Sequence, residues 1–216
     1  MEKRYEITEK QLTFLNNYLL RKYPSITDET RIELVDHLVS DFEKTTEDGN
    51  LSQYLSNKLS FIRKFIFDRA NTHQKRYGKE TWKQFYSFLT YIKLLPITFS
   101  VLILFYFLNE NINGKWSWGT LAIIQLLIFL SSIIFGTIYK KELKKLDEVK
   151  YLSADIWLPY VMVQLPSGFG FDDYIMSNSI LFTFYASFTI IYAISAFIVI
   201  REKRKIILEK YKHLLY

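Results

Sequence analysis

Apolar positions recur with helical spacing in the first third of the chain, and long apolar runs follow it. Thr8 and Gln11 form a capping-box pattern, a hydroxyl N-cap followed three residues later by an amide. This pattern predicts a helix from there to about Arg21. Its apolar positions, which we expect on one side, are Leu12, Phe14, Leu15, Tyr18 and Leu19.

Two further amphipathic helices are predicted. Pro24 and Ser25 end the first helix, and Thr27 and Asp28 begin the second, with acids in the first turn, where the helix dipole favours them. Its expected buried stripe is Ile32, Leu34, Val35, Leu38, Val39 and Phe42. A turn at residues 47–50 precedes a third helix, from Leu51 to about His73, expected to bury Tyr54, Leu55, Leu59, Ile62, Phe65 and Ile66. Three such stripes can cover one another, which predicts a three-helix domain over residues 1–76.

The second helix carries a recognisable pattern, Arg31-Ile-Glu-Leu-Val-Asp-His-Leu-Val-Ser-Asp-Phe-Glu43. With the preceding Ile7-Thr-Glu-Lys-Gln-Leu segment, it resembles the HAAS-type signalling domain, over about residues 6–75 and chiefly through Glu33 to Leu38. The Leu-Gly-Asp/Ser-Pro turn that often ends such domains does not occur near residues 60–75. The resemblance implies a bacterial, cytoplasmic helical module ahead of several membrane spans. It also implies a regulatory partner, often a PadR-like transcription factor, and no chemistry.

Four apolar stretches are long enough to be considered as membrane spans: residues 85–108, 118–139, 151–171 and 175–200. The first contains Lys93 and Pro96, and Pro96 is a candidate for a kink. The third has Asp155 near its start and Pro159 and Pro166 inside it. We therefore expect an all-α protein with a four-helix transmembrane domain over residues 85–200, with three spans plus a re-entrant segment at 151–171 as the alternative.

Charge orients these spans. Basic residues cluster before the first span (including the predicted linker, residues 77–84), in the loop at 140–145 and in the tail at 201–216. The loop at 109–117 holds one lysine, and the loop at 166–178 holds no basic residue. Because positively charged loops stay in the cytoplasm, both termini are predicted to be cytoplasmic, in an inner membrane. This requires an even number of crossings.

Composition narrows the function classes. The 216 residues are 50% hydrophobic, and they include no cysteine, which excludes disulfides and thiolate chemistry. The net charge of +6 is concentrated beside the spans, so it favours anionic lipid headgroups over direct nucleic-acid binding. The glycine-containing segment at 165–173 matches neither a nucleophile elbow nor a P-loop. We predict no enzymatic activity, cofactor or metal site.

One set of candidate site residues lies in the second helix. Glu33, His37 and Asp41 are four residues apart and share a helix face, a spacing that can also hold a metal. A solvated polar face opposite the apolar stripe, or a packing and hydrogen-bond site typical of the resembled family, is the simpler interpretation. With Asp36, these residues are the candidates for partner binding, and His37 could respond to pH.

A second set lies near or within the spans: Lys93, Gln125 and Asp155. Ionisable groups at membrane depth are functional candidates, although both charged residues lie near span ends, where snorkelling explains them. Lys93 and Asp155 could pair, since both ends are expected at the same leaflet. Two functions remain open: a regulatory membrane protein acting through protein–protein interaction, and a transporter or accessory subunit of a membrane complex. A homo-oligomer is compatible with both.

Overall fold

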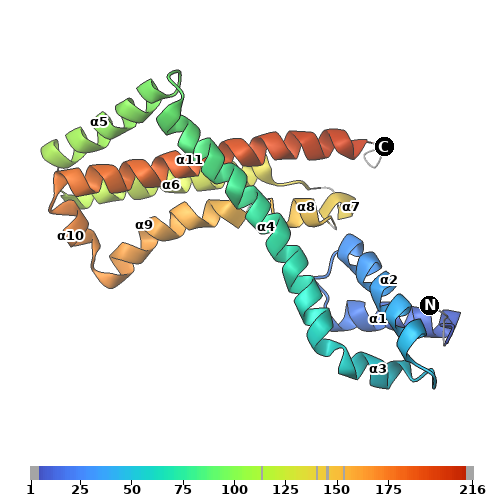
Figure 1. Ribbon diagram of the computed structural model, residues 1–216. Helices are drawn as coiled ribbons and strands as arrows, with labels where there is room; N and C mark the ends of the chain where they lie inside the picture. The colour runs from blue at the N-terminus through green and yellow to red at the C-terminus, as the bar shows by residue number, and fades with distance from the viewer. Residues whose placement is uncertain (1–4, 113, 140, 145, 153, 213–216) are drawn as a thin grey trace. The chain divides into compact units, whose positions relative to one another are not determined.

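The computed structural model describes residues 5–112, 114–139, 141–144, 146–152 and 154–212 (Figure 1). The last four residues of the predicted tail and parts of two predicted loops lie outside these ranges. Within them, every regular element is a helix, which confirms the predicted all-α class. The chain divides into two compact units, Met1–His73 with Lys140–Lys150 and Gln74–Tyr139 with Tyr151–Tyr216.

The first unit contains α1 (Glu9–Lys22), α2 (Asp28–Thr45), α3 (Leu51–Asn57) and the start of α4 (Leu59–Thr90), together with α7 (Lys141–Lys144) and α8 (Asp147–Lys150). The predicted capping box is present, because the Thr8 side chain accepts from the Gln11 backbone and the Gln11 side chain accepts from the Thr8 backbone. The predicted N-cap Thr27 likewise accepts from Thr30 N. These caps supply partners for backbone N–H groups that a helix start leaves unpaired.

Leucine and aromatic side chains fill the core of the first unit. The fully buried members include Leu15, Leu19, Leu34, Leu38, Phe42 and Ile62. The turn before α3 depends on Gly49, whose φ of 66° is left-handed and whose absent Cβ leaves room for the Tyr5 ring. Tyr5 also packs edge-on against Phe42, with ring centroids 5.4 Å apart, so this turn is closed by the segment preceding α1.

Some predicted positions in the first unit are wrong. Ile32 was expected in the buried stripe but is 63% exposed, because it precedes Leu34 by two residues and so lies about 200° around the helix from it. Leu12 and Phe14 are also exposed. The predicted third helix is interrupted at Lys58, whose N–H donates to both Leu55 O and Tyr54 O in a tight turn. Beyond that turn α4 continues to Thr90, so the predicted linker at residues 77–84 is helical.

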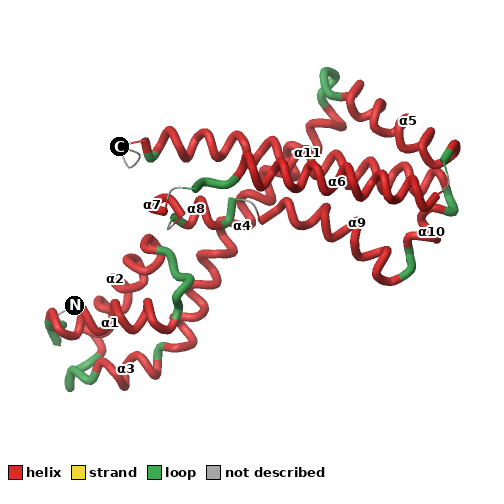
Figure 2. Tube along the Cα trace, turned by 180° about the vertical axis from the view of Figure 1, so that it is seen from behind, coloured by secondary structure: helices red, strands yellow, loops and turns green. Residues whose placement is uncertain are grey.

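The second unit is organised around one long helix, α11 (Ser179–Lys210). The later part of α4 belongs to this unit, with α5 (Leu95–Asn111), α6 (Gly114–Gly136), a 3₁₀ turn η1 (Ala154–Ile156), α9 (Trp157–Phe169) and α10 (Asp172–Met176). Helices α5, α6 and α9 run alongside α11 (Figures 1 and 2). The buried cluster that joins them includes Phe105, Trp118, Leu121, Val163, Phe182 and Ala186.

Contacts at the two ends of this bundle define its topology. At one end, Asn109 Nδ2 donates to Met176 O (3.2 Å) and to Ser179 Oγ (3.0 Å), which brings the α5–α6 and α10–α11 connections together. At the other end, the Phe135 and Phe197 rings lie 6.3 Å apart, and Ile200 packs over Gly136. Helices α6 and α11 are therefore parallel to each other and antiparallel to α5 and α9.

Length and composition identify the helices that could cross a membrane. Helices α6 and α11 qualify, and the bent pair α4 and α5 qualifies if it is counted as one span. The predicted span at 118–139 corresponds to α6, and the one at 175–200 to α11, which starts at Ser179 and continues through the predicted tail to Lys210. The membrane and multi-helix character of the prediction is thus supported, whereas the count of four spans is not established.

Two predicted spans differ from the structure. The span at 85–108 is broken, because α4 ends at Thr90 and α5 begins at Leu95, with an angle of 86° between them. Pro96 lies in the first turn of α5, where its missing N–H costs nothing, so the break precedes the expected kink. The segment at 151–171 contains η1 and the 13-residue α9, about 20 Å long, which is shorter than a hydrocarbon core of about 30 Å.

Candidate functional site

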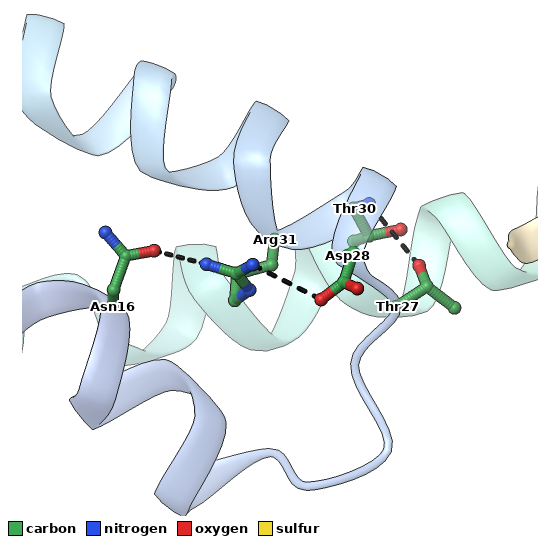
Figure 3. A network of polar contacts seen from close by, with 5 residues as sticks. All are labelled: Asn16, Thr27, Asp28, Thr30 and Arg31. Carbon is green, nitrogen blue, oxygen red and sulfur yellow. Dashed lines mark hydrogen bonds and ion pairs between the residues drawn. The ribbon is translucent and has the colours of Figure 1, made fainter. Parts of the chain in front are cut away.

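The candidate residues of α2 are positioned by a helix fixed at its start. The Arg31 guanidinium donates to Asn16 Oδ1 of α1 and to Asp28 Oδ1 (3.2 Å for the latter), and Thr30 N donates to the Thr27 hydroxyl (Figure 3). These bonds tie the first turn of α2 to α1. The buried stripe of α2 then sets which residues turn outward.

Asp41 is the centre of a polar cluster. Its Oδ2 accepts from the Tyr54 hydroxyl (2.6 Å), and the Lys58 ammonium pairs with the same oxygen (2.7 Å). The Tyr54 hydroxyl also lies 3.2 Å from Leu38 O, and Lys58 Nζ lies 5.6 Å from the centre of the Tyr54 ring. The interruption at Lys58 therefore places a cation beside the acid, so the partly exposed Asp41 is both hydrogen-bonded and ion-paired.

The surroundings shift two pKa values in this cluster. Burial alone would raise the pKa of Asp41, but the hydrogen bonds from Lys58 and Tyr54, with the charges of Lys58 and Lys44, lower it overall. Burial, together with the hydrogen bond to Asp41 and its negative charge, raises the pKa of Tyr54 above its usual value of 10.0. Near neutral pH Asp41 is thus a carboxylate and Tyr54 a neutral phenol.

Glu33 is held by a second cross-helix contact. Its Oε2 lies 2.5 Å from Arg69 Nη2 of α4, and both side chains are about one-third exposed. His37 lies between the two ion pairs along α2, with its ring 5.4 Å from that of Phe65 in an edge-on arrangement. The predicted four-residue spacing therefore places all three residues toward α3 and the start of α4, where His37 is exposed and Glu33 and Asp41 are partly exposed.

Two adjoining hollows lie along this face of α2 and α4 and share Phe61. One of about 200 Å³ is lined by His37, Asp41, Tyr54, Lys58 and Phe61. The other, of about 310 Å³, is lined by Glu33, Phe61, Lys64, Phe65, Asp68, Arg69 and Thr72. We refer to these two hollows together as the α2–α4 groove. Asp36 is exposed and lines neither hollow.

The groove combines a half-exposed aromatic ring with charges of both signs. Phe61 is 42% exposed, and an acid and a base flank it on each side. Within the described residues no group of three or more histidine, cysteine or acidic side chains could hold a metal. Such a surface suits a peptide or helix that places an apolar side chain on Phe61 and polar groups on the ion pairs.

The three candidate residues of the second unit have different surroundings. Lys93 is exposed in the break between α4 and α5, and Asp155 Oδ2 accepts from the Thr81 hydroxyl (3.2 Å), so the predicted Lys93–Asp155 pair is wrong. A Cβ at Gly78 would lie 3.5 Å from Asp155 Oδ1, which shows how closely this carboxylate approaches α4.

Gln125 lies in the interior of the bundle. Its side chain is 1% exposed on α6, and within the described structure neither of its amide atoms has a hydrogen-bond partner. Two other buried hydroxyls of the bundle have partners within their own helices. Ser132 donates to Ile128 O (2.8 Å) and Ser195 to Ile191 O (2.7 Å), each one turn earlier in its own helix.

Several groove residues were not among the predicted candidates: Tyr54, Lys58, Phe61 and Arg69. Tyr54 was expected in the core and Phe61 was not considered. The signal available in the sequence is the pattern of acids on α2 and bases after residue 57, but pairing them requires knowing that the chain turns at Lys58.

Comparison of the chain with protein-family models, curated proteins and solved structures finds no match in any of the three.

Proposed function

We propose that this chain is a regulatory or signalling membrane protein whose helical first unit binds a cytoplasmic protein through the α2–α4 groove. The observation that carries the proposal is Phe61, a half-exposed ring between the Asp41–Lys58 and Glu33–Arg69 ion pairs. Aromatic side chains surrounded by oriented polar groups are typical of binding hot spots. The resemblance to HAAS-type domains supports the same role and names a PadR-like transcription regulator as one partner.

The proposed membrane topology has four crossings, formed by α5, α6, α9 and α11, with both termini in the cytoplasm. It is supported by the contacts of Asn109 with Met176 and Ser179, which place the two non-basic loops at one end. The basic loop at 140–145 follows the other end of α6, and the basic part of α11 follows the other end of its apolar run. Both basic segments therefore lie at the end away from the non-basic loops. At α9, the short helix is preceded directly by η1, and the chain turns at Gly170 into α10.

The 86° bend gives the end of α4 a separate role in this proposal. If α5 crosses the membrane, α4 approaches it nearly parallel to the surface. Trp82, Tyr86 and Tyr91 are exposed there, and tyrosine and tryptophan favour the membrane–water interface. In this proposal the end of α4 is a separate helix that packs on α11, with Trp82 against Phe188 and Tyr192, rather than part of a straight span.

The test of partner binding uses the full chain, purified in detergent and used as bait. Phe61→Ala is the test variant, and Phe67→Ala is the matched control, because Phe67 is 64% exposed on the same helix but lines neither hollow. We expect the wild type and the control to recover the same specific protein. Phe61→Ala should weaken its binding by about 2 kcal/mol, or roughly thirtyfold. Equal recovery by all three would reject the groove as the binding surface.

A second candidate function, transport or service as an accessory subunit, is favoured by Gln125. A buried amide without partners inside an apolar bundle is costly and is typical of functional sites in membranes. Substrate flux in proteoliposomes that is lost in Gln125→Leu would support this alternative. Flux that is absent, or is unchanged by the substitution, would reject it.

A further inference from the structure

A hollow on α11, distinct from the α2–α4 groove, begins where the apolar run of this helix ends. It measures about 470 Å³, and its lining includes Phe197, Ile198, Arg201, Arg204, Lys205 and Leu208. Arg201, Lys205 and Leu208 follow Phe197 at intervals of three or four residues, so they share one face of the helix. Phe197 and Ile198 lie at the end nearer the apolar run, the bases follow them, and Leu208 lies at the far end.

The cations of this hollow are available for a ligand. The neighbouring Lys203 is already engaged, with its Nζ 2.5 Å from Glu80 Oε2. Within the part of the chain that the structure describes, no ion pair involves Arg201, Arg204 or Lys205. Arg204 is half-buried, and its Nε is enclosed without a hydrogen-bond partner among the described residues. Glu202 is the one acid in the lining, so the hollow carries an excess of two positive charges.

We propose that this hollow binds one anionic phospholipid, with the phosphate between Arg201, Arg204 and Lys205 and an acyl chain against Phe197 and Ile198. The guanidinium groups of Arg201 and Arg204 match phosphate oxygens in charge and geometry. The order of apolar and basic side chains along α11 is that of an amphiphile, which favours a lipid over a free phosphate. Basic pockets at the ends of membrane helices bind such headgroups.

The proposal depends on α11 crossing the membrane, but it does not depend on the α2–α4 groove. The two ideas therefore fail separately: loss of partner binding in Phe61→Ala leaves lipid binding unchanged, and the reverse holds for variants of the hollow.

The test measures lipid binding to the full chain in detergent by native mass spectrometry, with phosphatidylglycerol as probe and phosphatidylcholine for comparison. The test variant is Arg201→Gln/Arg204→Gln/Lys205→Gln. The matched control, Lys75→Gln/Lys79→Gln/Lys83→Gln, removes three exposed charges from α4. We expect the wild type and the control to retain one phosphatidylglycerol that phosphatidylcholine does not replace. The test variant should bind it at least about tenfold more weakly, since each base near an anionic surface contributes about fivefold.

Three results would overturn the proposal. Unchanged binding in the test variant would exclude the hollow, and an equal loss in both triple variants would indicate diffuse attraction to positive charge. Displacement of the lipid by water-soluble glycerol phosphate would indicate a free-phosphate site. If the triple variant does not fold, Arg201→Gln and Lys205→Gln alone alter exposed side chains, and each should weaken binding by about fivefold.

Discussion

Both units have apolar cores, but they differ in the side chains that they expose and in the polar groups that they bury. In the first unit, leucines and Phe42 form the core, while the groove carries ion pairs and exposed apolar side chains such as Ile32 stand among polar neighbours. In the second unit, Gln125, Ser132 and Thr189 are buried, whereas Ile103, Ile123 and Phe184 are more than 60% exposed. Water makes the first arrangement stable, and only an apolar solvent makes the second stable. Such a contrast is typical of a membrane protein, and α6 and α11 are long and apolar enough to cross a bilayer.

The largest expected difference between the units concerns a phenylalanine. Phe42→Ala should destabilise the first unit by about 3–5 kcal/mol, because the ring is fully buried. Phe184→Ala should change the stability of α11 by less than about 0.5 kcal/mol, because exposed side chains contribute little. Hydrogen exchange of the amides of α2 and α11 in the full chain measures both effects. Comparable losses in the two variants would remove the distinction.

A charge on the exposed apolar surface should have the next largest effect. Leu127→Lys, near the middle of α6, should oppose membrane insertion by about 2.5–3.5 kcal/mol. Leu20→Lys, on an exposed position of α1, should be neutral within about 0.5 kcal/mol. An insertion assay with a glycosylation reporter, together with the yield in the membrane fraction, compares them. Normal insertion of Leu127→Lys would argue that this face of α6 does not meet lipid.

Close helix packing in the second unit predicts a smaller effect at Gly136. A Cβ there would collide with Cγ2 of Ile200, whereas a Cβ at Gly119 would meet nothing within 4 Å. We expect Gly136→Ala to be less stable than Gly119→Ala by about 1–3 kcal/mol, the usual cost of overpacking. Thermal unfolding in detergent, followed by size-exclusion chromatography, gives the difference. Equal transition temperatures would show that α6 and α11 are not in this contact.

The smallest expected effects are the pH dependences of the first unit. The pKa of Asp41 is lower in the folded state than its unfolded value of 3.8, so the ionised carboxylate stabilises the folded state at pH values above 3.8. This stabilisation is lost as the pH falls through the folded-state pKa of Asp41. Because the carboxylate is 40% exposed, Asp41→Asn should cost less than about 1 kcal/mol near neutral pH. Denaturation followed at several acidic pH values should show a flatter profile for Asp41→Asn than for the wild type.

For Tyr54 we expect the opposite pH dependence of stability, at alkaline pH. Its raised pKa leaves stability intact below pH 10.0, and stability falls as the pH rises above that value because the unfolded phenol ionises first. Tyr54→Phe should remove this decline. An identical alkaline profile in the variant would mean that the hydroxyl is not buried against Asp41.

The sequence predicted those features that depend on neighbours along the chain. The Thr8–Gln11 capping box and the stripe Leu34, Leu38 and Phe42 are local patterns, and both are present. The break before Leu95 was missed because Pro96 suggested a kink inside a continuous helix, whereas the structure uses this proline to start a new one. The groove could be predicted only in part, since Asp41 meets Tyr54 and Lys58 through a turn that has no glycine or proline to mark it.

The most direct test of the lipid-facing surface exploits the absence of cysteine from the chain. Single cysteines replace Ile123 and Phe184 in the second unit, and Phe14 and Ile32 in the first unit for comparison, because all four side chains are exposed. A spin label on each cysteine, in protein reconstituted into liposomes, reports whether water or lipid surrounds that position. We predict that labels at 123 and 184 collide with dissolved oxygen but not with a water-soluble nickel chelate, and that labels at 14 and 32 collide with the chelate. Chelate access at 123 and 184 equal to that at 14 and 32 would contradict the account.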